Sequence, residues 1–532
     1  MDRRFPLSSL QVIIDFNDTA LPAHLEADYC IVGSGVVGLA ISLELQKTGK
    51  QILLLESGDM EQNGSYQSLY DADITGQPFS GHLEGRFRMF GGSSNRWGGQ
   101  ALPLPEIIFE ERDWIQHSGW PIQHSDIEPF YPMAERYLGL APLPFETDYF
   151  AKFKLPNLNL DEQVLQYHFS KWSPRPNLGR EYLNQLTASP NVRVVLHANV
   201  TNLELAKDLK TVCRASLRSL EGKNGEASAK RFILCCGGIE NARLLLLSNK
   251  QLPEGIGNQR DLVGRFFQDH PTVQIATLKP LEKDRVQAYF NARFLNTTRL
   301  LPRLSLSDKY QKKHRLLSAS STIQFIVPSE NAAEQLRSIF RKISRRQFDT
   351  SLFAHAWKAA LQLPAAAATA ADYLLSQRVY LPGSEYRLAV IMEQEPDPES
   401  RIYLSEKLDA LRQAKTAINW KPSDLTLRTL KHFSRAAKEE LEKTGLCKVE
   451  LDDWLNEPQD TWRKQLGDAF HHIGTTRMAA SDSEGVVDTN CKVFGTENLY
   501  IAGSSVFPSG GHSNPSLAAI ALGFRLAEHL KN

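Results

Sequence analysis

The stretch Cys30-Ile31-Val32-Gly33-Ser34-Gly35-Val36-Val37-Gly38 decides the fold of this 532-residue chain. It joins an apolar run at residues 29–32 to a segment of helical periodicity at residues 36–47, and a second apolar run follows at residues 51–55. Such runs are typical of parallel strands that are buried on both faces. In a turn of this kind the first glycine permits a tight bend, the second lets the backbone approach a pyrophosphate, and the third lets the helix pack closely.

A carboxylate follows the second apolar run. Glu56 stands about twenty residues beyond the glycines, where it can accept hydrogen bonds from adenosine ribose hydroxyls. This order predicts a dinucleotide site in an α/β fold; the alternative is a turn that only packs a helix on a strand. The turn by itself does not distinguish FAD from NAD. The turn lies near the N-terminus, and further strands are dispersed along the chain. Both features favour FAD, because an FAD site needs more of the chain than one strand–helix–strand unit.

The overall composition limits the classes of function. The chain has 42% hydrophobic and 23% charged residues and a formal net charge of zero, which is ordinary for a folded globular protein. A general nucleic-acid binder would carry a basic surplus. The length predicts two domains.

The cysteines and the first residues of the chain indicate a reducing compartment. None of the six cysteines forms a C-x-x-C pair, and Cys30, Cys235 and Cys236 lie in apolar runs, so we expect buried thiols rather than disulfides or metal ligands. No apolar signal segment precedes Asp15, and the most apolar internal stretch, at residues 361–375, is too short and too charged to span a membrane. We expect a cytoplasmic protein without a metal site, nucleic-acid partner or membrane association.

Further strands and helices are expected beyond the glycine turn. A strand at residues 191–205 and a hairpin around residues 222–225 lead to a turn at residues 235–238 and a helix at residues 240–248. A separate, largely antiparallel sheet and an amphipathic helix are expected later in the chain. These elements are strands at residues 289–295, 316–327, 386–393 and 401–404 and a helix at residues 424–444.

Residues 335–375 combine a basic amphipathic pattern with an alanine-rich run. A helix of this composition can bind a membrane surface or a partner. We prefer the plainer interpretation, a helical insertion at about residues 330–380 with a solvated face, which covers the substrate site.

Four more stretches carry a resemblance to a known family. They are the loop FGGSSNRWGG at residues 90–99, the segment 113–129, the segment NARLL at residues 241–245, and a C-terminal block with HHIGT at 471–475 and GGHSNPS at 510–516. In this order they resemble the glucose–methanol–choline (GMC) oxidoreductases, over essentially the whole chain and weakly between residues 310 and 383. Within the family, the likeness is nearest to bacterial members that act on sugars or glycosides.

The resemblance implies an α/β fold with two domains. A Rossmann-like FAD-binding domain of the GMC/p-hydroxybenzoate hydroxylase type is discontinuous. An α+β substrate domain contains the antiparallel sheet. The expected boundaries are residues 1–105, 190–270 and 465–532 for the FAD-binding domain, and residues 106–189 and 271–464 for the substrate domain.

The resemblance also implies a catalytic pair and a cofactor site. His471 matches the active-site histidine of the family, and Asn514 matches its partner. His512 and His472 are candidates for substrate contact; the alternatives are a loop hydrogen bond for His512 and an orientation away from the site for His472. The expected FAD-binding residues are Gly33, Ser34, Gly35, Val36, Val37, Gly38, Glu56, Ser57, Gly91, Gly92, Ser93, Asn95, Trp97, Gly98, Gly99, Val200, Cys236, Gly237, Ala502, Gly503, Asn514, Pro515 and Ser516.

The sequence departs from the family at two positions. Arg96 stands where members with covalently bound flavin carry a histidine, so we expect non-covalent FAD. Trp97 occupies the place of an asparagine that other members use near the flavin. The turn Asp269-His270-Pro271 also resembles a family turn, and we interpret it as structural.

These residues predict an FAD-dependent alcohol dehydrogenase or oxidase. The neutral imidazole of His471 would accept the hydroxyl proton, because its reference pKa of about 6.5 lies near working pH. Asn514 would align the alcohol so that the carbon delivers hydride to flavin N5. A hydroxyl of a sugar, polyol or glycoside would become an aldehyde or ketone, and the electron acceptor stays open between oxygen, a quinone and others.

Two other functions compete with this prediction. One is an NAD(P)-dependent dehydrogenase without flavin. The other is a flavin-fold binding or accessory subunit without turnover, which the basic segment around Arg341 motivates.

Overall fold

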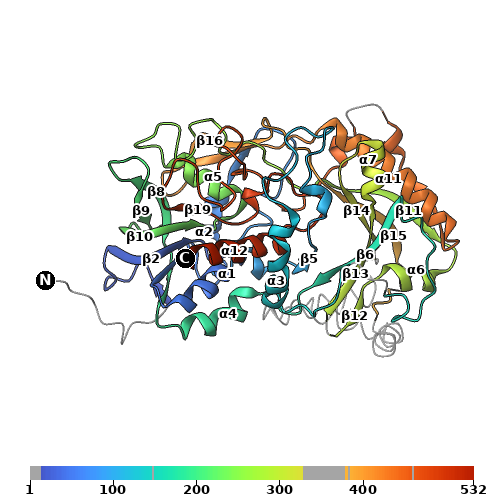
Figure 1. Cartoon of the computed structure of the whole chain (residues 1–532), viewed down its shortest axis with the longest axis horizontal. Coiled ribbons are helices and arrows are strands. Elements are labelled where there is room, and N and C mark those ends of the chain that lie inside the picture. The colour runs from blue at the N-terminus through green and yellow to red at the C-terminus, as the bar shows by residue number, and fades with distance from the viewer. Residues whose placement is uncertain are drawn as a thin grey trace, which may run out of the picture.

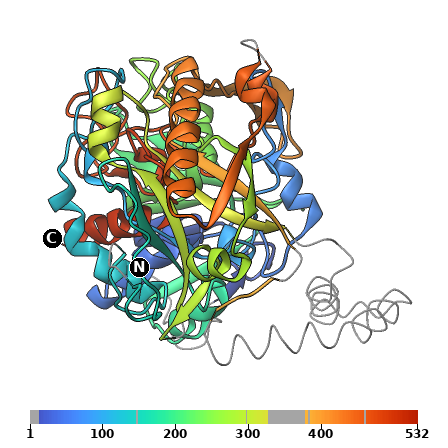
Figure 2. The ribbon, with the colours of Figure 1, turned by 90° about the vertical axis from the view of Figure 1, so that its right-hand side faces the viewer.

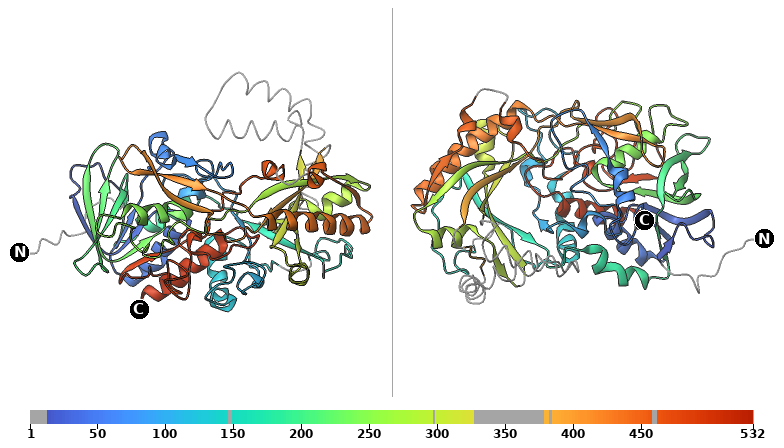
Figure 3. Two further views of the ribbon diagram at one scale, coloured as in Figure 1. Left: turned by 90° about the horizontal axis from the view of Figure 1, so that it is seen from above. Right: turned by 180° about the vertical axis from the view of Figure 1, so that it is seen from behind.

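The computed structural model describes residues 13–145, 149–296, 298–326, 378–381, 384–457 and 461–531. Two eight-stranded sheets lie in opposite halves of an elongated molecule (Figures 1 and 3). The insertion predicted at about residues 330–380, with its basic segment at residues 335–375, falls outside the described residues except for residues 378–380.

The first sheet is built around the glycine turn. β2 (His24–Val32), α1 (Val36–Leu45) and β3 (Ile52–Leu55) follow one another, and β2 and β3 pair in parallel. All four residues of β3 are buried, as a strand covered on both faces requires. The predicted strand, turn, helix and strand are confirmed, and Gly49 ends the helical segment with a φ of 74°.

Strands from the beginning, middle and end of the chain share this sheet. Their order is β1-β7-β3-β2-β10-β9-β8, with β19 paired in parallel to β10. From β1 to β10 the neighbours are parallel, whereas β8, β9 and β10 form an antiparallel meander. The remaining strands are β1 (Ile13–Asp15), β7 (Val192–Leu196), β8 (Asn199–Leu205), β9 (Val212–Arg218), β10 (Asn224–Leu234) and β19 (Leu499–Ile501).

One prediction in this sheet is wrong. Residues 191–205 form two strands, β7 and β8, and not one. His197 between them has a left-handed backbone with a φ of 59°, which turns the chain out of the parallel part of the sheet and into the meander. The hairpin predicted around residues 222–225 is confirmed as β9 and β10.

The last helix returns the C-terminus to the glycine turn. α12 (Ser516–Lys531) packs on α1, as Figure 1 shows, and also contacts α3 (Tyr131–Tyr137). The hydroxyl of Tyr29 in β2 donates a hydrogen bond to the carbonyl of Leu530 at 2.7 Å. α4 (Leu178–Thr187) packs on α1 as well. Segments from both ends of the chain therefore build one half of the molecule.

The second sheet has the order β18-β11-β15-β14-β13-β6-β5, with β12 paired to β13. All of its pairs are antiparallel. α11 (Asp424–Lys443) lies across it (Figure 2) and shares an apolar core with Leu304, Leu388 and Val390. The strands are β5 (Gln100–Ala101), β6 (Leu165–Trp172), β11 (Thr272–Pro280), β12 (Arg293–Leu295), β13 (Thr298–Leu306), β14 (Ala319–Ile326), β15 (Glu385–Met392) and β18 (Cys447–Leu451).

Side chains alternate between the two faces of each strand. Leu304 of β13 faces the core under α11, so its neighbours Arg303 and Ser305 lie on the other face. His168 of β6 is opposite Arg303, and Ser320 of β14 is opposite Ser305. The face turned away from α11 is therefore polar along three adjacent strands.

Two strand predictions need correction. Residues 289–290 end α6 (Lys283–Phe290), and only residues 293–295 of the predicted strand are extended. Val286, Tyr289 and Phe290 are all buried at helical spacing, so packing decides against the strand preference of the aromatic residues. Residues 401–404 belong to β16 (Arg401–Leu408), which joins β17 (Ala414–Asn419) and β4 (Ala72–Ile74) in a third sheet.

The other predicted elements of this region are confirmed. β14 and β15 lie at the predicted strands, and α11 lies at the predicted amphipathic helix. The division into two discontinuous domains stays a prediction. The helices of the described residues lack the length and the apolar character that a membrane crossing requires.

Candidate active site

The parallel strands of the first sheet end at the same edge, and a cavity of about 590 Å³ lies there. Gly33 follows β2, Glu56 follows β3, the turn 235–237 follows β10, and Gly503 follows β19. All four segments line the cavity. Ligands of open α/β sheets bind at this carboxyl edge.

The three glycines of the first turn have different structural roles. A Cβ on Gly33 would lie 2.6 Å from the carbonyl oxygen of Cys235, and a Cβ on Gly38 would lie 2.0 Å from that of Gly33. These two glycines therefore allow close packing of β10 and α1 against the turn. A Cβ on Gly35 would meet nothing within 4 Å, although Gly35 lines the cavity.

Gly237 and Gly503 complete an open cradle. Both line the cavity, and a Cβ on either would meet nothing within 4 Å. Their φ angles of 84° and 119° favour glycine independently. The first turn of α1 also borders this space through Val36 and Val37, and the N-terminus of a helix attracts anions. The cradle fits the pyrophosphate of a dinucleotide such as FAD.

Glu56 is held in place by the turn that precedes α1. Its carboxylate accepts hydrogen bonds from the backbone N–H of Ser34 at 3.1 Å, from the Ser34 hydroxyl at 2.6 Å and from the N–H of Gly58 at 2.9 Å. Carboxylate oxygens have further lone pairs, so Glu56 can still accept a ribose hydroxyl from the cavity that it lines.

Most of the predicted cofactor residues line the cavity, and four do not. Ser34 binds Glu56, and Gly38 packs under the turn. Gly91 takes a φ of 86° at the start of the small-residue loop, and the Asn95 amide donates to the Phe90 carbonyl at 2.8 Å. The residues that do line it are Gly33, Gly35, Val36, Val37, Glu56, Ser57, Gly92, Ser93, Trp97, Gly98, Gly99, Val200, Cys236, Gly237, Ala502, Gly503, Asn514, Pro515 and Ser516.

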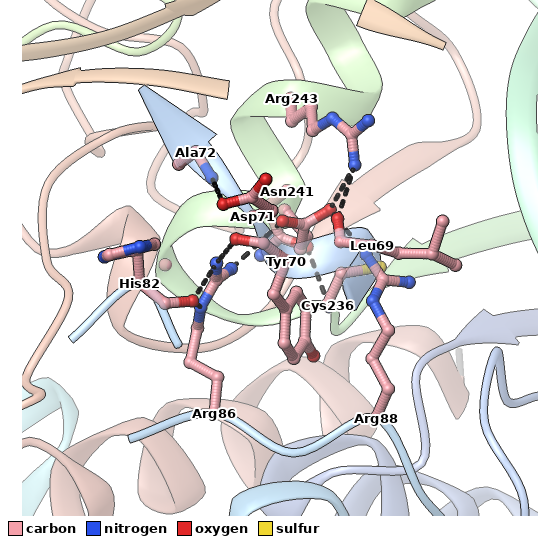
Figure 4. Close-up of polar contacts among 12 residues, drawn as sticks. Leu69, Tyr70, Asp71, Ala72, His82, Arg86, Arg88, Cys236, Asn241 and Arg243 are labelled. Atoms are coloured by element: carbon pink, nitrogen blue, oxygen red, sulfur yellow. Dashed lines mark hydrogen bonds and ion pairs between the residues drawn. The ribbon is translucent and has the colours of Figure 1, made fainter. Parts of the chain in front are cut away.

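A buried arginine cluster borders the same cavity. We define it as Tyr70, Arg86, Arg88, Glu240 and Arg243. Figure 4 labels the tyrosine and the three arginines. The Tyr70 ring lies between the guanidinium groups of Arg86 and Arg88, at 3.9 and 4.2 Å from the ring centre. Glu240 of α5 (Gly237–Leu247) binds the guanidinium groups of Arg86, Arg88 and Arg243 at 3.0, 2.9 and 3.2 Å.

The cluster carries more positive than negative charge. Burial alone would raise the pKa of Glu240, but the three arginines outweigh it and lower the pKa to about 2, so Glu240 is ionised. Asp409 binds Arg243 at 2.6 Å and is the second carboxylate beside the three guanidinium groups. Arg88 Nε is buried and has no hydrogen-bond partner among the described residues. The surplus positive charge suits an anionic ligand in the cavity.

His471 and Asn514 meet at the wall of the cavity. The Asn514 amide nitrogen lies 3.2 Å from His471 Nε2, and both residues line the cavity. On its other side, His471 Nδ1 lies 2.7 Å from Nδ1 of His270. The structure therefore joins three residues that are separated by up to 244 positions in the sequence.

These contacts assign the protons of the imidazole pair. In the orientation that the structure gives the Asn514 amide, its NH₂ group donates, so His471 Nε2 is the acceptor. His471 then carries its proton on Nδ1 and donates it to His270 Nδ1. Asn514 Oδ1 is buried without a partner among the described residues. The Nε2 electron pair of His471 and the free amide oxygen of Asn514 thus meet at one wall of the cavity.

Both imidazoles are neutral near pH 7. Burial, followed by the charges of His270, His472 and Arg303, lowers the pKa of His471 well below its usual 6.5. Burial also lowers the pKa of His270 to about 4. A neutral His471 has the base form that proton abstraction needs.

Asp269 anchors the backbone around this pair. Its buried carboxylate accepts hydrogen bonds from the N–H groups of His270, Ala469 and His471 at 2.6, 3.0 and 3.1 Å. The segment that carries His471 is therefore tied to the segment that carries His270.

Replacing Asp269 with alanine is expected to lower the free energy of unfolding by about 2–4 kcal/mol, because three N–H groups, one buried and two partly buried, lose their acceptor. Urea denaturation measures this loss. Asp468→Ala is the matched control, since Asp468 accepts two N–H groups in a partly exposed position. An equally small effect of both substitutions contradicts the anchoring role.

The two weaker substrate candidates have different places. His472 borders the cavity and packs against Phe79 and Phe267. His512 does not line the cavity; its Nδ1 and Nε2 lie 2.7 and 3.3 Å from the hydroxyls of Ser318 and Ser305.

Three features of the site were missed by the sequence analysis. His270 was interpreted as part of a structural turn, and the arginine cluster was not identified, although Arg86 and Arg88 directly precede the small-residue loop. The tip of the β16–β17 hairpin, with Asp409 and Gln413, also lines the cavity. No local pattern marks a hairpin tip as part of a site whose glycine turn lies more than 300 residues earlier in the chain.

Comparisons with known proteins indicate the family that this chain resembles. A family model described as GMC oxidoreductase matches residues 396–523. The 6'''-hydroxyparomomycin C oxidase of Streptomyces lividus is 21% identical over 94% of this chain and 92% of its own length. The fructose dehydrogenase large subunit of Gluconobacter japonicus is 19% identical over 96% of this chain and 98% of its own.

A similar fold is present among solved structures. A formate oxidase of Aspergillus oryzae, studied for the effect of a mutation on its FAD modification, superposes with a TM-score of 0.56 at 17% identity. The match covers 96% of this chain and 99% of that chain. The region matched by the family model includes both His471 and Asn514.

Proposed function

Because the chain belongs to the GMC oxidoreductases, FAD enzymes that act on CH–OH groups, we propose that it oxidises a sugar, polyol or glycoside hydroxyl to an aldehyde or ketone with His471 as the base. The observation that carries this proposal is the meeting of His471 Nε2 and Asn514 at the wall of a cavity with an open glycine cradle. The relatives named for a paromomycin derivative and for fructose support a carbohydrate substrate.

Proton removal and substrate positioning are carried out by different residues of the chain. His471 Nε2 takes the hydroxyl proton of the substrate. Before that step, the hydrogen bond from His471 Nδ1 to His270 keeps the ring proton on Nδ1, so that Nε2 is unprotonated. Asn514 holds the substrate oxygen through its amide group, which removes orientational freedom before the reaction. FAD, when bound, supplies the hydride acceptor.

The cofactor is held by the cradle and the arginine cluster. Gly35, Gly237 and Gly503 give the pyrophosphate close access to the backbone, and Glu56 accepts the ribose hydroxyls. Arg88 offers its free Nε–H and the surplus positive charge of the cluster. Arg96, where a histidine would carry a covalent flavin link, supports non-covalent binding.

The rate of flavin reduction should stay constant from about pH 6.5 upward and fall only at more acid pH. The lowered pKa of His471 leaves the base form in place at and above neutrality, and protonation removes it only below the ordinary histidine range. Rapid-mixing measurements without oxygen between pH 5 and 9 test this. An acid limb centred above pH 7 contradicts the assignment of His471.

Anaerobic mixing of the FAD-loaded protein with a panel of sugars, polyols and glycosides tests the proposed function. Loss of the yellow flavin absorbance with at least one of them is expected. A colourless protein with nicotinamide-dependent turnover favours the NAD(P) alternative. A flavin that none of these alcohols reduces, in a protein that captures a stable partner, favours an accessory subunit.

A further inference from the structure

Arg303 is a buried cation that the proposed mechanism does not use. It lies on β13, on the polar face of the second sheet that is turned away from α11. Its side chain is 4% exposed. Nε donates to the hydroxyl of Ser320 at 2.9 Å, and this is the one hydrogen bond of its guanidinium group within the described residues.

No carboxylate pairs with Arg303 in the described part of the chain. Two buried carboxylates lie next to strands of this sheet in the sequence, Glu393 after β15 and Asp269 before β11. Both bind other groups. Glu393 binds Arg112 at 2.8 and 2.5 Å and accepts the N–H of Ser318 at 3.0 Å. Asp269 accepts the three backbone N–H groups described above.

The polar groups beside Arg303 are neutral. Ser305 binds His168 Nε2 at 2.6 Å, and burial followed by the charge of Arg303 lowers the pKa of His168 to about 3. Burial and neighbouring charges also lower the pKa of His512 well below its usual value. A histidine that stays neutral cannot balance the positive charge and does not repel an anion.

Arg303 lies close to the reacting groups. Ser305, two residues along the same face, has its hydroxyl 3.3 Å from His512 Nε2, and His512 precedes Asn514 by two residues. The charge of Arg303 acts on both His270 and His471. The guanidinium group therefore lies near the catalytic pair, although Arg303 is not among the residues that line the cavity at the glycine turn.

An unpaired buried charge destabilises a folded protein by several kcal/mol. Such a group persists where a ligand supplies the counter-charge. A single guanidinium group matches one carboxylate, in charge and in its planar, two-pronged geometry. A phosphate dianion would require a second cation, and Arg112 is already paired with Glu393.

We propose that the substrate is a hydroxy acid of the sugar type, an aldonate or uronate, whose carboxylate binds Arg303 while its hydroxyl faces His471. This inference rests on the proposed function and narrows its substrate class. The bound carboxylate would fix the distance between the anionic end of the substrate and the carbon that is oxidised.

Matched pairs of alcohols test the proposal. D-gluconate and sorbitol differ at one end by a carboxylate, as do methyl glucuronoside and methyl glucoside. The measured quantity is the substrate concentration that gives half of the maximal rate of flavin reduction. For the wild-type holoenzyme, this concentration should be at least tenfold lower for at least one of the acids than for its neutral partner. Arg303→Met should remove this preference by weakening the acid about a hundredfold more than its neutral partner, and Arg303→Lys should retain part of it.

Two results would overturn the proposal. One is a wild-type enzyme without preference for the acid in either pair. The other is an Arg303→Met variant in which the rate of flavin reduction falls equally with acid and neutral alcohols. That result would indicate that Arg303 interacts with the oxygen of the reacting hydroxyl in every substrate.

A binding measurement separates this proposal from the proposed function. Calorimetric titration of the holoenzyme with gluconate and with methyl glucuronoside requires no turnover. Arg303-dependent binding without any flavin reduction would support the anion site and contradict the oxidation. Reduction by neutral sugars, with neither acid bound, would support the oxidation and overturn the anion site.

The unfolding midpoint in urea gives a check that needs no ligand. Arg303→Met should raise the midpoint, because an uncompensated buried charge is removed. A fall in the midpoint would indicate that Arg303 stabilises the fold, and would contradict its role as a ligand site.

Discussion

Replacing His471 with alanine is expected to slow flavin reduction by about 10²–10⁴-fold, the usual contribution of a positioned general base. The substitution removes the Nε2 electron pair beside Asn514 and leaves the glycine cradle and the arginine cluster intact. FAD should therefore stay bound with its visible absorbance. Anaerobic rapid mixing with the best substrate measures the rate.

The control for this substitution is His529→Ala, which removes an exposed histidine of α12. It should reduce its flavin at the wild-type rate. An undiminished rate in His471→Ala removes His471 as the base. Loss of FAD from His471→Ala would instead show that the histidine supports the cofactor site.

Replacing Gly35 with alanine is expected to weaken FAD binding about 10–100-fold while the protein without cofactor keeps its stability. A Cβ at this position meets no protein atom within 4 Å but projects into the cavity. Forcing an extra methyl group into a filled site typically costs 1–3 kcal/mol. Titration of the protein with FAD, followed by flavin fluorescence, gives the dissociation constant.

Gly64→Ala is the matched control for Gly35→Ala. Gly64 begins α2 (Gly64–Gln67) on the surface, and a Cβ there also meets nothing within 4 Å. FAD affinity should be unchanged. If Gly35→Ala binds FAD as tightly as this control, the pyrophosphate does not approach Gly35. Gly38→Ala is unsuitable for this test, because its Cβ would clash with Gly33 at 2.0 Å even without a ligand.

The parts of the fold that could be predicted are those with local causes. The glycine turn, α1 and the strands beside it follow from apolar runs and three glycines within thirty residues, and α11 follows from one amphipathic pattern. The strand prediction failed where tertiary packing overrode local preference. Tyr289 and Phe290 favour strands by residue type but end a helix because that helix buries them together.

The candidate site was predictable only in part, for a similar reason. His471 and Asn514 lie in stretches that resemble a family. The contact between His270 and His471 joins residues 201 positions apart and depends on the anchoring of both segments by Asp269. Arg303 lies in a strand that was not predicted, and its lack of a counter-ion is a property of the packed sheet. A one-dimensional pattern does not encode either feature.

A crystal structure of the FAD-loaded protein tests the central claim most directly. The account predicts the pyrophosphate against Gly35 and Gly503 and the isoalloxazine ring beside His471 Nε2 and the Asn514 amide. A ring bound away from His471, or a pyrophosphate outside the glycine cradle, would contradict it.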